Sequence, residues 1–199
     1  MLSKWYIHFL FLFREHQPQR TYTLKHNDYR QYKKALAKDF QNKCGYTNCH
    51  HAWFGGITNF HIDHFKAKSL YPLLKNVYEN LVYATSFVNI AKSDDDNDLY
   101  LDPCKVDFNL HFERDNHGNV SPKSNSPHAQ YMYVKLKLYL KRYGIIAKLE
   151  HIYQAWLRNE KAIEAITDEE LRSKFVTYQK EVSYLFMKYF KYLRVELYE

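Results

Sequence analysis

Apolar and polar positions divide the chain into an N-terminal part with strand and helix patterns, an irregular middle and a helical C-terminal part. The first apolar run, residues 5–13 (WYIHFLFLF), is followed by HQPQ and then by RTYTLK at residues 20–25. Aromatic and β-branched residues on both sides of a turn-forming segment predict an N-terminal β-hairpin. A short buried helix over residues 4–14 is the alternative interpretation.

An amphipathic helix is predicted next, over residues 27–43. Asn27 is a suitable N-cap for it. Large apolar side chains recur at three- and four-residue steps, the spacing of one helix face, at Tyr29, Tyr32, Leu36 and Phe40.

The middle of the chain, from Cys44 to about Pro122, is rich in turn-forming Gly, Pro and Asn residues. Within it, residues 60–65 (FHIDHF) alternate as a strand does, and residues 80–84 (NLVYA) indicate a second short strand. A helix that holds Asn89 is expected to follow. Such a segment is more typical of a functional site than of a scaffold.

Helix-forming and aromatic residues dominate after SPKSNSPHA and predict about three helices between Pro127 and Leu197. Thr167, with Glu170 three residues later, forms a capping box that predicts where one helix begins. We expect most Tyr and Phe residues here to form the core of a helical bundle. The predicted fold is α+β in three parts: an N-terminal hairpin and helix (1–43), a central module (44–122) and a helical region (123–199).

Length and composition narrow the classes of protein. A chain of 199 residues can bury one sizeable core, so it needs neither a disulfide nor a metal for stability alone. The net charge of +7 favours an anionic partner, with nucleic acid ahead of a membrane surface. The 19 Tyr residues can fill a core or line a nucleic-acid groove, and composition does not choose between these.

Neither a membrane span nor a secretion signal is predicted. The apolar run at residues 5–13 is nine residues long, whereas a span needs roughly 20. Arg14, Glu15 and His16 follow it, where a signal peptide would carry a small-residue cleavage site. Because three Cys is an odd number, no disulfide framework is expected, and we predict a reducing, cytoplasmic location.

Four polar residues carry the candidate chemistry. Asp63 and His64 end the first predicted strand, and a carboxylate beside an imidazole can bind a divalent cation and accept a proton. Asn80 follows 16 residues after His64, and Asn89 follows nine residues after Asn80. Two strands and a helix would bring these groups to one point, as metal-dependent phosphodiester cleavage requires. Taken singly, each residue could be a surface charge, a satisfied polar group or a turn former.

This segment, HIDHFKAKSLYPLLKNVYENLVYA followed by NIAKSD, resembles the HNH nuclease family, whose motif of two strands, a helix and a metal is also called ββα-Me. The resemblance covers roughly residues 40–122, and LDPCKVDFNLHFERDNHGNVSP is similar to the strand-rich continuation of many members. The chain also resembles the HNH components of bacterial antiphage systems of the Septu and retron-linked kinds. That narrower resemblance implies an ATPase as a partner protein.

The resemblance implies a role for each residue. His64 is the general base that takes a proton from water, and Asp63 is a metal ligand. Asn80 is the middle Asn of the motif, which hydrogen-bonds across the loop and fixes the shape of the site. Asn89 stands where the final His often stands and is a second ligand for Mg²⁺ or Mn²⁺. Lys92 pairs with a carboxylate or a phosphate.

A departure from the pattern of the resembled family argues against a structural zinc. Cys44 and Cys49 correspond to the first Cys pair of many relatives, but Thr85 and Val88 occupy the positions of the second. Four thiolates in tetrahedral geometry are therefore not available. Other residues that could complete a site are His50, His51 and Cys104.

Six residues are predicted to contact nucleic acid: His61, Lys68, Lys92, Lys135, Lys141 and Arg142. The last three lie in the basic stretch at residues 133–144, whose alternative interpretation is a helix with one solvated basic face. The acidic run at residues 94–98 is interpreted as a solvated helix end and not as a second metal site.

The predicted function is therefore that of a metal-dependent HNH endonuclease, with DNA as the favoured substrate and a role in antiphage defence implied by the narrower resemblance. A catalytically degenerate HNH-fold module that binds nucleic acid or protein is the alternative. The absent second Cys pair favours that alternative, whereas the retention of all four site residues argues against it. A nuclease toxin directed at RNA would use the same chemistry.

Overall fold

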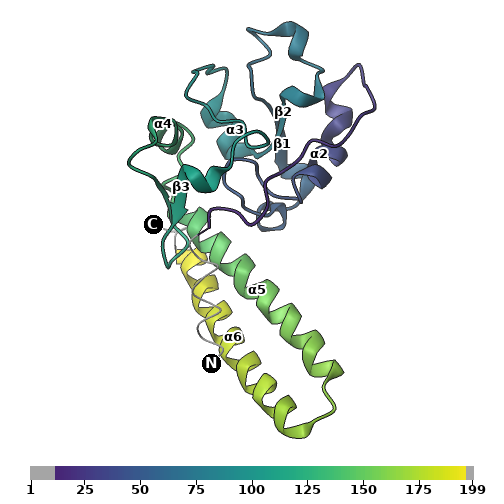
Figure 1. Ribbon diagram of the computed structural model, residues 1–199, viewed down its shortest axis with the longest axis vertical. Coiled ribbons are helices and arrows are strands. Elements are labelled where there is room, and N and C mark those ends of the chain that lie inside the picture. Colours follow the sequence, from purple (N-terminus) through teal and green to yellow (C-terminus); the bar gives the residue numbers. More distant parts are fainter. Residues whose placement is uncertain (1–11, 196–199) are drawn as a thin grey trace.

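The computed structural model describes residues 12–195, which contain two antiparallel strand pairs and five α-helices (Figure 1). The helices are α2 (Lys33–Asp39), α3 (Ser86–Lys92), α4 (Pro127–Lys135), α5 (Lys141–Ala165) and α6 (Glu169–Val195). The strands are β1 (Phe60–His64), β2 (Leu81–Thr85), β3 (Phe112–Arg114) and β4 (Val120–Pro122). The predicted α+β class is confirmed.

Strands β1 and β2 form the predicted pair in the middle of the chain. They run antiparallel from Phe60 opposite Thr85 to His64 opposite Leu81. All five residues of β2 are buried, which matches its apolar sequence. Helix α3 follows β2 at once, because the Thr85 side chain accepts a hydrogen bond from the backbone N–H of Val88 and caps the helix. The arrangement of two strands and a helix thus arises from one continuous segment.

The predicted N-terminal hairpin is wrong in its second strand. Residues 20–25 form no strand, and residues 1–11, which hold most of the first strand, lie outside the described residues. This segment is held by side-chain hydrogen bonds and not by backbone pairing with another strand. Arg20 donates from Nε to the carbonyl of Leu81 (2.9 Å) and from Nη1 to Asp102 (2.9 Å). Within this segment Arg20 and Tyr22 are half-buried and the other four residues are exposed, so the pattern of Tyr, Thr and Leu did not mark a paired strand.

The predicted N-terminal helix is present but shorter than expected. Asp28, and not the preceding Asn27, provides the cap, and the first turn at Tyr29–Tyr32 is a 3-10 helix that leads into α2. Gln41 and Asn42 then adopt left-handed backbone angles, with φ of 53° and 59°, which end the helix. Of the predicted apolar face, Tyr32, Leu36 and Phe40 are at most 3% exposed, whereas Tyr29 is only half-buried.

A buried arginine connects the small sheet of β3 and β4 to the rest of the module. Arg114 donates from Nη2 to the carbonyl of Thr47 (2.8 Å) and from Nη1 to that of Gly118 (2.6 Å). Its guanidinium also lies 5.0 Å from the centre of the Phe13 ring. One side chain therefore joins three segments that are distant in the sequence.

Helices α5 and α6 form an antiparallel hairpin that projects from the module (Figure 1). The base of the hairpin packs closely, because a Cβ atom at Gly144 would lie 2.8 Å from the backbone nitrogen of Asn119. Trp53 also donates from Nε1 to Glu150 (2.7 Å). None of the helices in residues 12–195 is long and apolar enough to cross a membrane.

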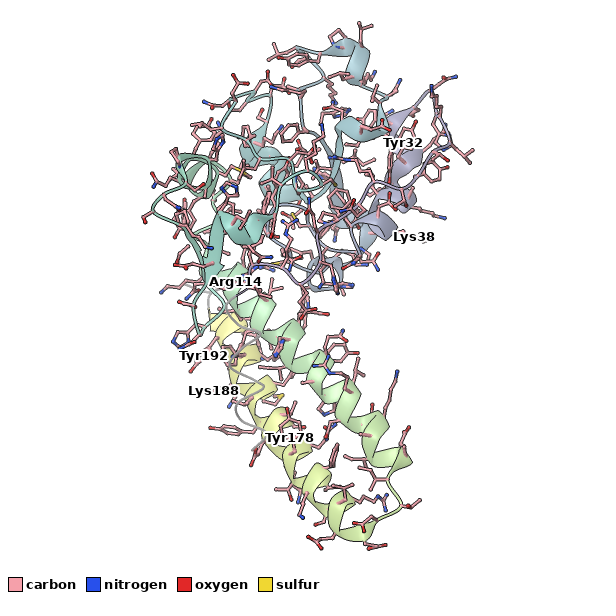
Figure 2. All side chains as sticks on the ribbon, viewed as in Figure 1. Tyr32, Lys38, Arg114, Tyr178, Lys188 and Tyr192 are labelled. Carbon is pink, nitrogen blue, oxygen red and sulfur yellow. The ribbon has the colours of Figure 1, made fainter. Side chains whose placement is uncertain are left out.

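The predicted bundle with an aromatic core is only partly correct. The far part of the hairpin is joined by polar contacts, such as the hydrogen bond from Asn159 to Gln179 (2.7 Å). Several large apolar side chains of α6 are exposed, including Tyr184 at 70%. Figure 2 shows Lys188 and Tyr192 on the side of α6 that lies away from α5.

Two local predictions about the helices need correction. The stretch at residues 133–144 is not one helix, because α4 ends at Lys135 and Lys137 has a φ of 54° before α5 begins. Helix α6 is capped by Asp168, whose side chain accepts from the N–H of Leu171 (2.7 Å), and not by Thr167. Thr167 and Asp168 are adjacent and both are residue types that cap helices, so the sequence pattern does not choose between them.

Replacing Arg114 with Met should lower the free energy of unfolding by about 2–4 kcal/mol, because the buried carbonyls of Thr47 and Gly118 would lose their donor. Glu113→Met, on the exposed face of the same strand, is the matched control and should change stability little. Urea unfolding followed by circular dichroism measures both. Equal stability of the two variants would contradict the role given to Arg114.

Candidate active site

A pocket of about 330 Å³ brings together three of the four predicted site residues, Asp63, His64 and Asn89. Its walls come from β1, from the loop that follows β1, and from α3 with the residues after it. The complete lining is Ile62, Asp63, His64, Ala67, Lys68, Asn89, Ile90, Ser93 and Asp94. Because β1 and α3 lie next to each other, Asn89 lines the same cavity as Asp63 and His64 although it is distant from them in the sequence.

The imidazole of His64 is held in one orientation. Its Nε2 lies 2.9 Å from the backbone carbonyl of Lys75, and because a carbonyl only accepts, Nε2 carries the proton. In the neutral ring Nδ1 is then the basic nitrogen. The ring of Tyr29 packs edge-on against the imidazole, with 4.7 Å between centroids.

The protonation state of His64 suits a base. Burial lowers the pKa of His64 below its usual 6.5, and the ammonium groups of Lys68, Lys92 and Lys75 add to this, while the hydrogen bond to the carbonyl of Lys75 opposes it. The neutral imidazole therefore predominates at pH 7. A neutral histidine with a fixed tautomer can accept a proton from water.

Asp63 is buried and has two polar partners. Its Oδ2 accepts from the hydroxyl of Tyr46 (2.6 Å), and its Oδ1 lies 3.4 Å from Nζ of Lys92. Burial raises the pKa of Asp63, whereas Lys92 and Tyr46 counteract that effect. Each carboxylate oxygen can accept two hydrogen bonds, so both oxygens keep capacity for a further ligand.

Lys92 does not reach solvent. Its side chain has no exposed surface, and Nζ donates to the carbonyl of His64 (2.8 Å) as well as pairing with Asp63. Of the two partners expected for Lys92, the carboxylate is the one present. The prediction that Lys92 contacts nucleic acid needs correction, because a buried ammonium cannot contact a phosphate outside.

Asn80 lies behind the pocket and supports the loop that forms one wall. Its Oδ1 accepts from the N–H of Lys66 (2.8 Å), and its Nδ2 donates to the carbonyl of Lys66 (2.9 Å) and to that of Leu74 (3.4 Å). The backbone of Asn80 also accepts from the N–H of Phe65 (2.8 Å). The side chain therefore spans the loop immediately after His64.

Asn89 and His61 contact each other across β1 and α3. Nδ2 of Asn89 lies 3.1 Å from Nδ1 of His61, so the amide donates and the ring accepts. This contact engages the nitrogen of the amide and leaves its oxygen as an available acceptor. Burial lowers the pKa of His61, and the charge of Lys33 lowers it further, so this ring is also suited to the neutral, accepting form.

The donors of the pocket fit a hydrated divalent cation. Within residues 12–195 there is no group of three or more His, Cys, Asp or Glu side chains arranged to hold a metal. The lining offers the carboxylates of Asp63 and Asp94 and the amide oxygen of Asn89, of which Asp63 and Asn89 are the predicted ligands, in a cavity with room for water. Mg²⁺ is commonly held by one or two protein oxygens and keeps several waters. The ammonium of Lys92 beside Asp63 should limit the affinity.

The region of the two cysteines is closely packed. Cys44 and Cys49 are buried free thiols, and the N–H of Thr85 lies 3.4 Å from Sγ of Cys44. Burial raises the pKa of Cys49 to about 11, which disfavours the thiolate that zinc requires. Thr85 and Val88 are also buried. That the protein lacks a structural zinc stays a prediction.

The remaining cations predicted to contact nucleic acid occupy different places. Lys68 is exposed on the wall of the pocket. Lys135 pairs with Asp95 (3.4 Å), and the guanidinium of Arg142 lies over the ring of Phe54 (5.6 Å). Lys135, Arg142 and the exposed Lys141 are not among the described residues that line the pocket.

Three residues of the site were missed in the sequence. Tyr46 binds Asp63, Tyr29 contacts His64, and Asp94 lines the pocket although the acidic run was interpreted as solvated. Tyr46 and Tyr29 are two of 19 Tyr residues and lie far from the motif in sequence, so no local signal distinguished them. Within the acidic run, Asp95 and Asp96 pair with Lys135 (3.4 Å) and Lys66 (3.3 Å), whereas Asp94 and Asp98 are exposed.

Comparison with known proteins adds no relative to this picture: no protein-family model matches the chain, and neither a curated protein nor a solved structure matches it.

Proposed function

We propose that this protein is a metal-dependent endonuclease of the HNH type, which hydrolyses phosphodiester bonds in nucleic acid. The observation that carries the proposal is the geometry of His64. The imidazole is held by the carbonyl of Lys75 so that Nδ1 is basic, and it lines one pocket together with Asp63 and Asn89. A base, an anionic ligand and a neutral oxygen ligand around one cavity are what water-driven phosphodiester hydrolysis requires.

The reaction begins with water in the pocket. Nδ1 of His64 takes a proton from this water, whose oxygen forms a bond to phosphorus in line with the leaving group. The bond from phosphorus to the 3′ oxygen breaks, and that oxygen takes a proton from solvent. The products carry 5′-phosphate and 3′-hydroxyl ends, and the proton on His64 returns to solvent.

The other residues of the chain hold the base and the substrate in place. The carbonyl of Lys75 and the ring of Tyr29 keep the imidazole oriented. Lys68, exposed on the pocket wall, is placed to contact a phosphate oxygen. A divalent cation such as Mg²⁺ or Mn²⁺ on Asp63 and Asn89 would supply stabilisation of the negative charge on the phosphate and the leaving oxygen.

DNA remains the favoured substrate, and the positive net charge supports an anionic polymer as partner. A role in antiphage defence with an ATPase partner rests on the sequence resemblance alone.

Cleavage of supercoiled plasmid and of single-stranded DNA in Mg²⁺ or Mn²⁺ tests the proposal. The parent protein should cut, and His64→Ala should lower the rate by about 100-fold or more because the base is lost. His117→Ala, an exposed residue in the turn between β3 and β4, is the control and should cut at the parental rate. A His64→Ala variant that cuts as well as the parent would exclude His64 as the base.

The pH dependence of cleavage reports the state of His64. Because burial and nearby lysines lower the pKa of His64, its neutral form persists below pH 6.5. The rate should therefore fall as pH decreases, with a midpoint below pH 6.5, and should be level above it. The measurement is kcat/KM as a function of pH. A midpoint above that value would show that another group limits the reaction.

Metal binding can be measured without any activity. Mg²⁺ or Mn²⁺ should raise the melting temperature of the parent, because a cation that binds only the folded state stabilises it. Asp63→Asn should remove this increase, whereas Asp98→Asn, whose side chain is fully exposed, should keep it. An increase that survives in Asp63→Asn would place the cation elsewhere and favour the binding-module alternative.

A further inference from the structure

A basic aromatic surface adjoins the pocket at His64 and Lys68, both of which line it. The ring of Tyr29, which touches His64, lies 5.3 Å from Nζ of Lys68 and 5.4 Å from the guanidinium of Arg30. Lys75, whose carbonyl orients His64, also carries an exposed ammonium beside this surface. Arg30 also pairs with the carboxylate of Asp28 (3.5 Å), which offsets part of its charge, and Lys68 and Lys75 leave a positive balance that attracts phosphate groups.

The opposite wall has a different chemical character. It is formed by α3, whose residues Phe87 and Ile90 lie one turn apart on the same face and are 59% and 68% exposed. Ile90 itself lines the pocket, next to Asn89. The inward face of the same helix is buried and holds Val88 and Lys92, so α3 is well packed and still presents two large apolar side chains to solvent.

Negative charge continues this wall beyond the helix. Asp94 lines the pocket directly, and the acidic run extends to Asp98, whose side chain is fully exposed. Two lysines, Lys66 and Lys135, pair with this run, which holds four carboxylates at positions 94, 95, 96 and 98. The net charge of the run with its lysines is therefore negative. A phosphate backbone would be repelled from this side.

We infer that the substrate is nucleic acid that is unpaired at the cleavage site, and that Phe87 and Ile90 contact its bases while its phosphates follow the surface of Lys68 and Arg30. This inference rests on the proposed function and names the substrate class of the same pocket. The charge asymmetry orients the strand, because its backbone is attracted to one side and repelled from the other. The part of the strand that meets α3 is then the base, and an aromatic side chain can stack on a base whose face is open.

Base pairing decides whether that contact can form. In an intact duplex the faces of the bases are covered by their neighbours, so Phe87 would meet only groove edges and sugars. In a single strand or a bubble the bases can turn outward and stack on aromatic side chains. Contact with Phe87 and Ile90 should therefore favour unpaired over paired substrate.

Fluorescently labelled oligonucleotides of one sequence test this inference as a single strand, a full duplex and a duplex with a central bubble. Binding is measured by anisotropy in the His64→Ala background, and cleavage is measured with His64 present. The single strand and the bubble should bind about tenfold more tightly than the duplex, as expected for one stacked base. Phe87→Ser with Ile90→Ser should abolish this preference.

Leu110→Ser is the matched control, because Leu110 is 66% exposed and lies outside the pocket. It should bind all three substrates as the parent does. Both substituted residues of α3 are exposed, so the double variant should keep the parental melting temperature. Versions of the oligonucleotides in DNA and RNA then distinguish the two polymers.

The outcomes separate the inference from the proposed function. Equal binding of duplex and single strand by the parent, or a double variant that keeps the preference, would overturn the inference even if cleavage depends on His64. A preference that depends on Phe87 and Ile90, without any cleavage, would support this surface and contradict the nuclease proposal. Absence of both binding and cleavage would contradict both.

Discussion

The buried ion pair between Asp63 and Lys92 is the interaction on which the candidate site depends. Asp63 belongs to β1 and Lys92 to the end of α3, so the pair fastens the strand to the helix. Lys92 also bonds the carbonyl of His64, which ties the residue that carries the base to the same point. Both side chains are almost without exposed surface, and removing one partner of such a pair commonly costs about 3–5 kcal/mol because the other charge stays buried.

That pair also sets the electrostatics of the pocket. Among the described residues, Asp63 is the one carboxylate that is buried and also lines the cavity, and the ammonium of Lys92 beside it offsets its negative charge. Burial lowers the pKa of His64, and the same ammonium, with Lys68 and Lys75, adds to this effect and favours the neutral ring. The ion pair thus forms part of the frame of the pocket and contributes to the neutral state of His64. Tyr46 and Tyr29 complete this frame from outside the motif.

The projecting hairpin of α5 and α6 stands apart from these constraints. Its base packs on the module through Gly144 and the hydrogen bond from Trp53, whereas its far part relies on polar contacts between the helices. Exposed aromatic residues on α6 therefore contribute little to the core. The hairpin packs on the module at one end and extends away from β1, β2 and α3 (Figure 1).

The sequence by itself determined the local elements of the site: two strands and a helix around Asp63, His64 and Asn89, because alternation and helix capping are encoded by near neighbours. It also placed Asn80 just before the second strand, where a side chain can span the loop. Only the tertiary structure decided which polar groups meet. These contacts join segments that are distant in the chain. They are the bonds of the buried Lys92, the contacts of Tyr46 and Tyr29 in the site, and the side-chain hydrogen bonds that hold residues 20–25. Periodicity reports that a face is buried but not against what, because the partner is chosen by packing of the whole core.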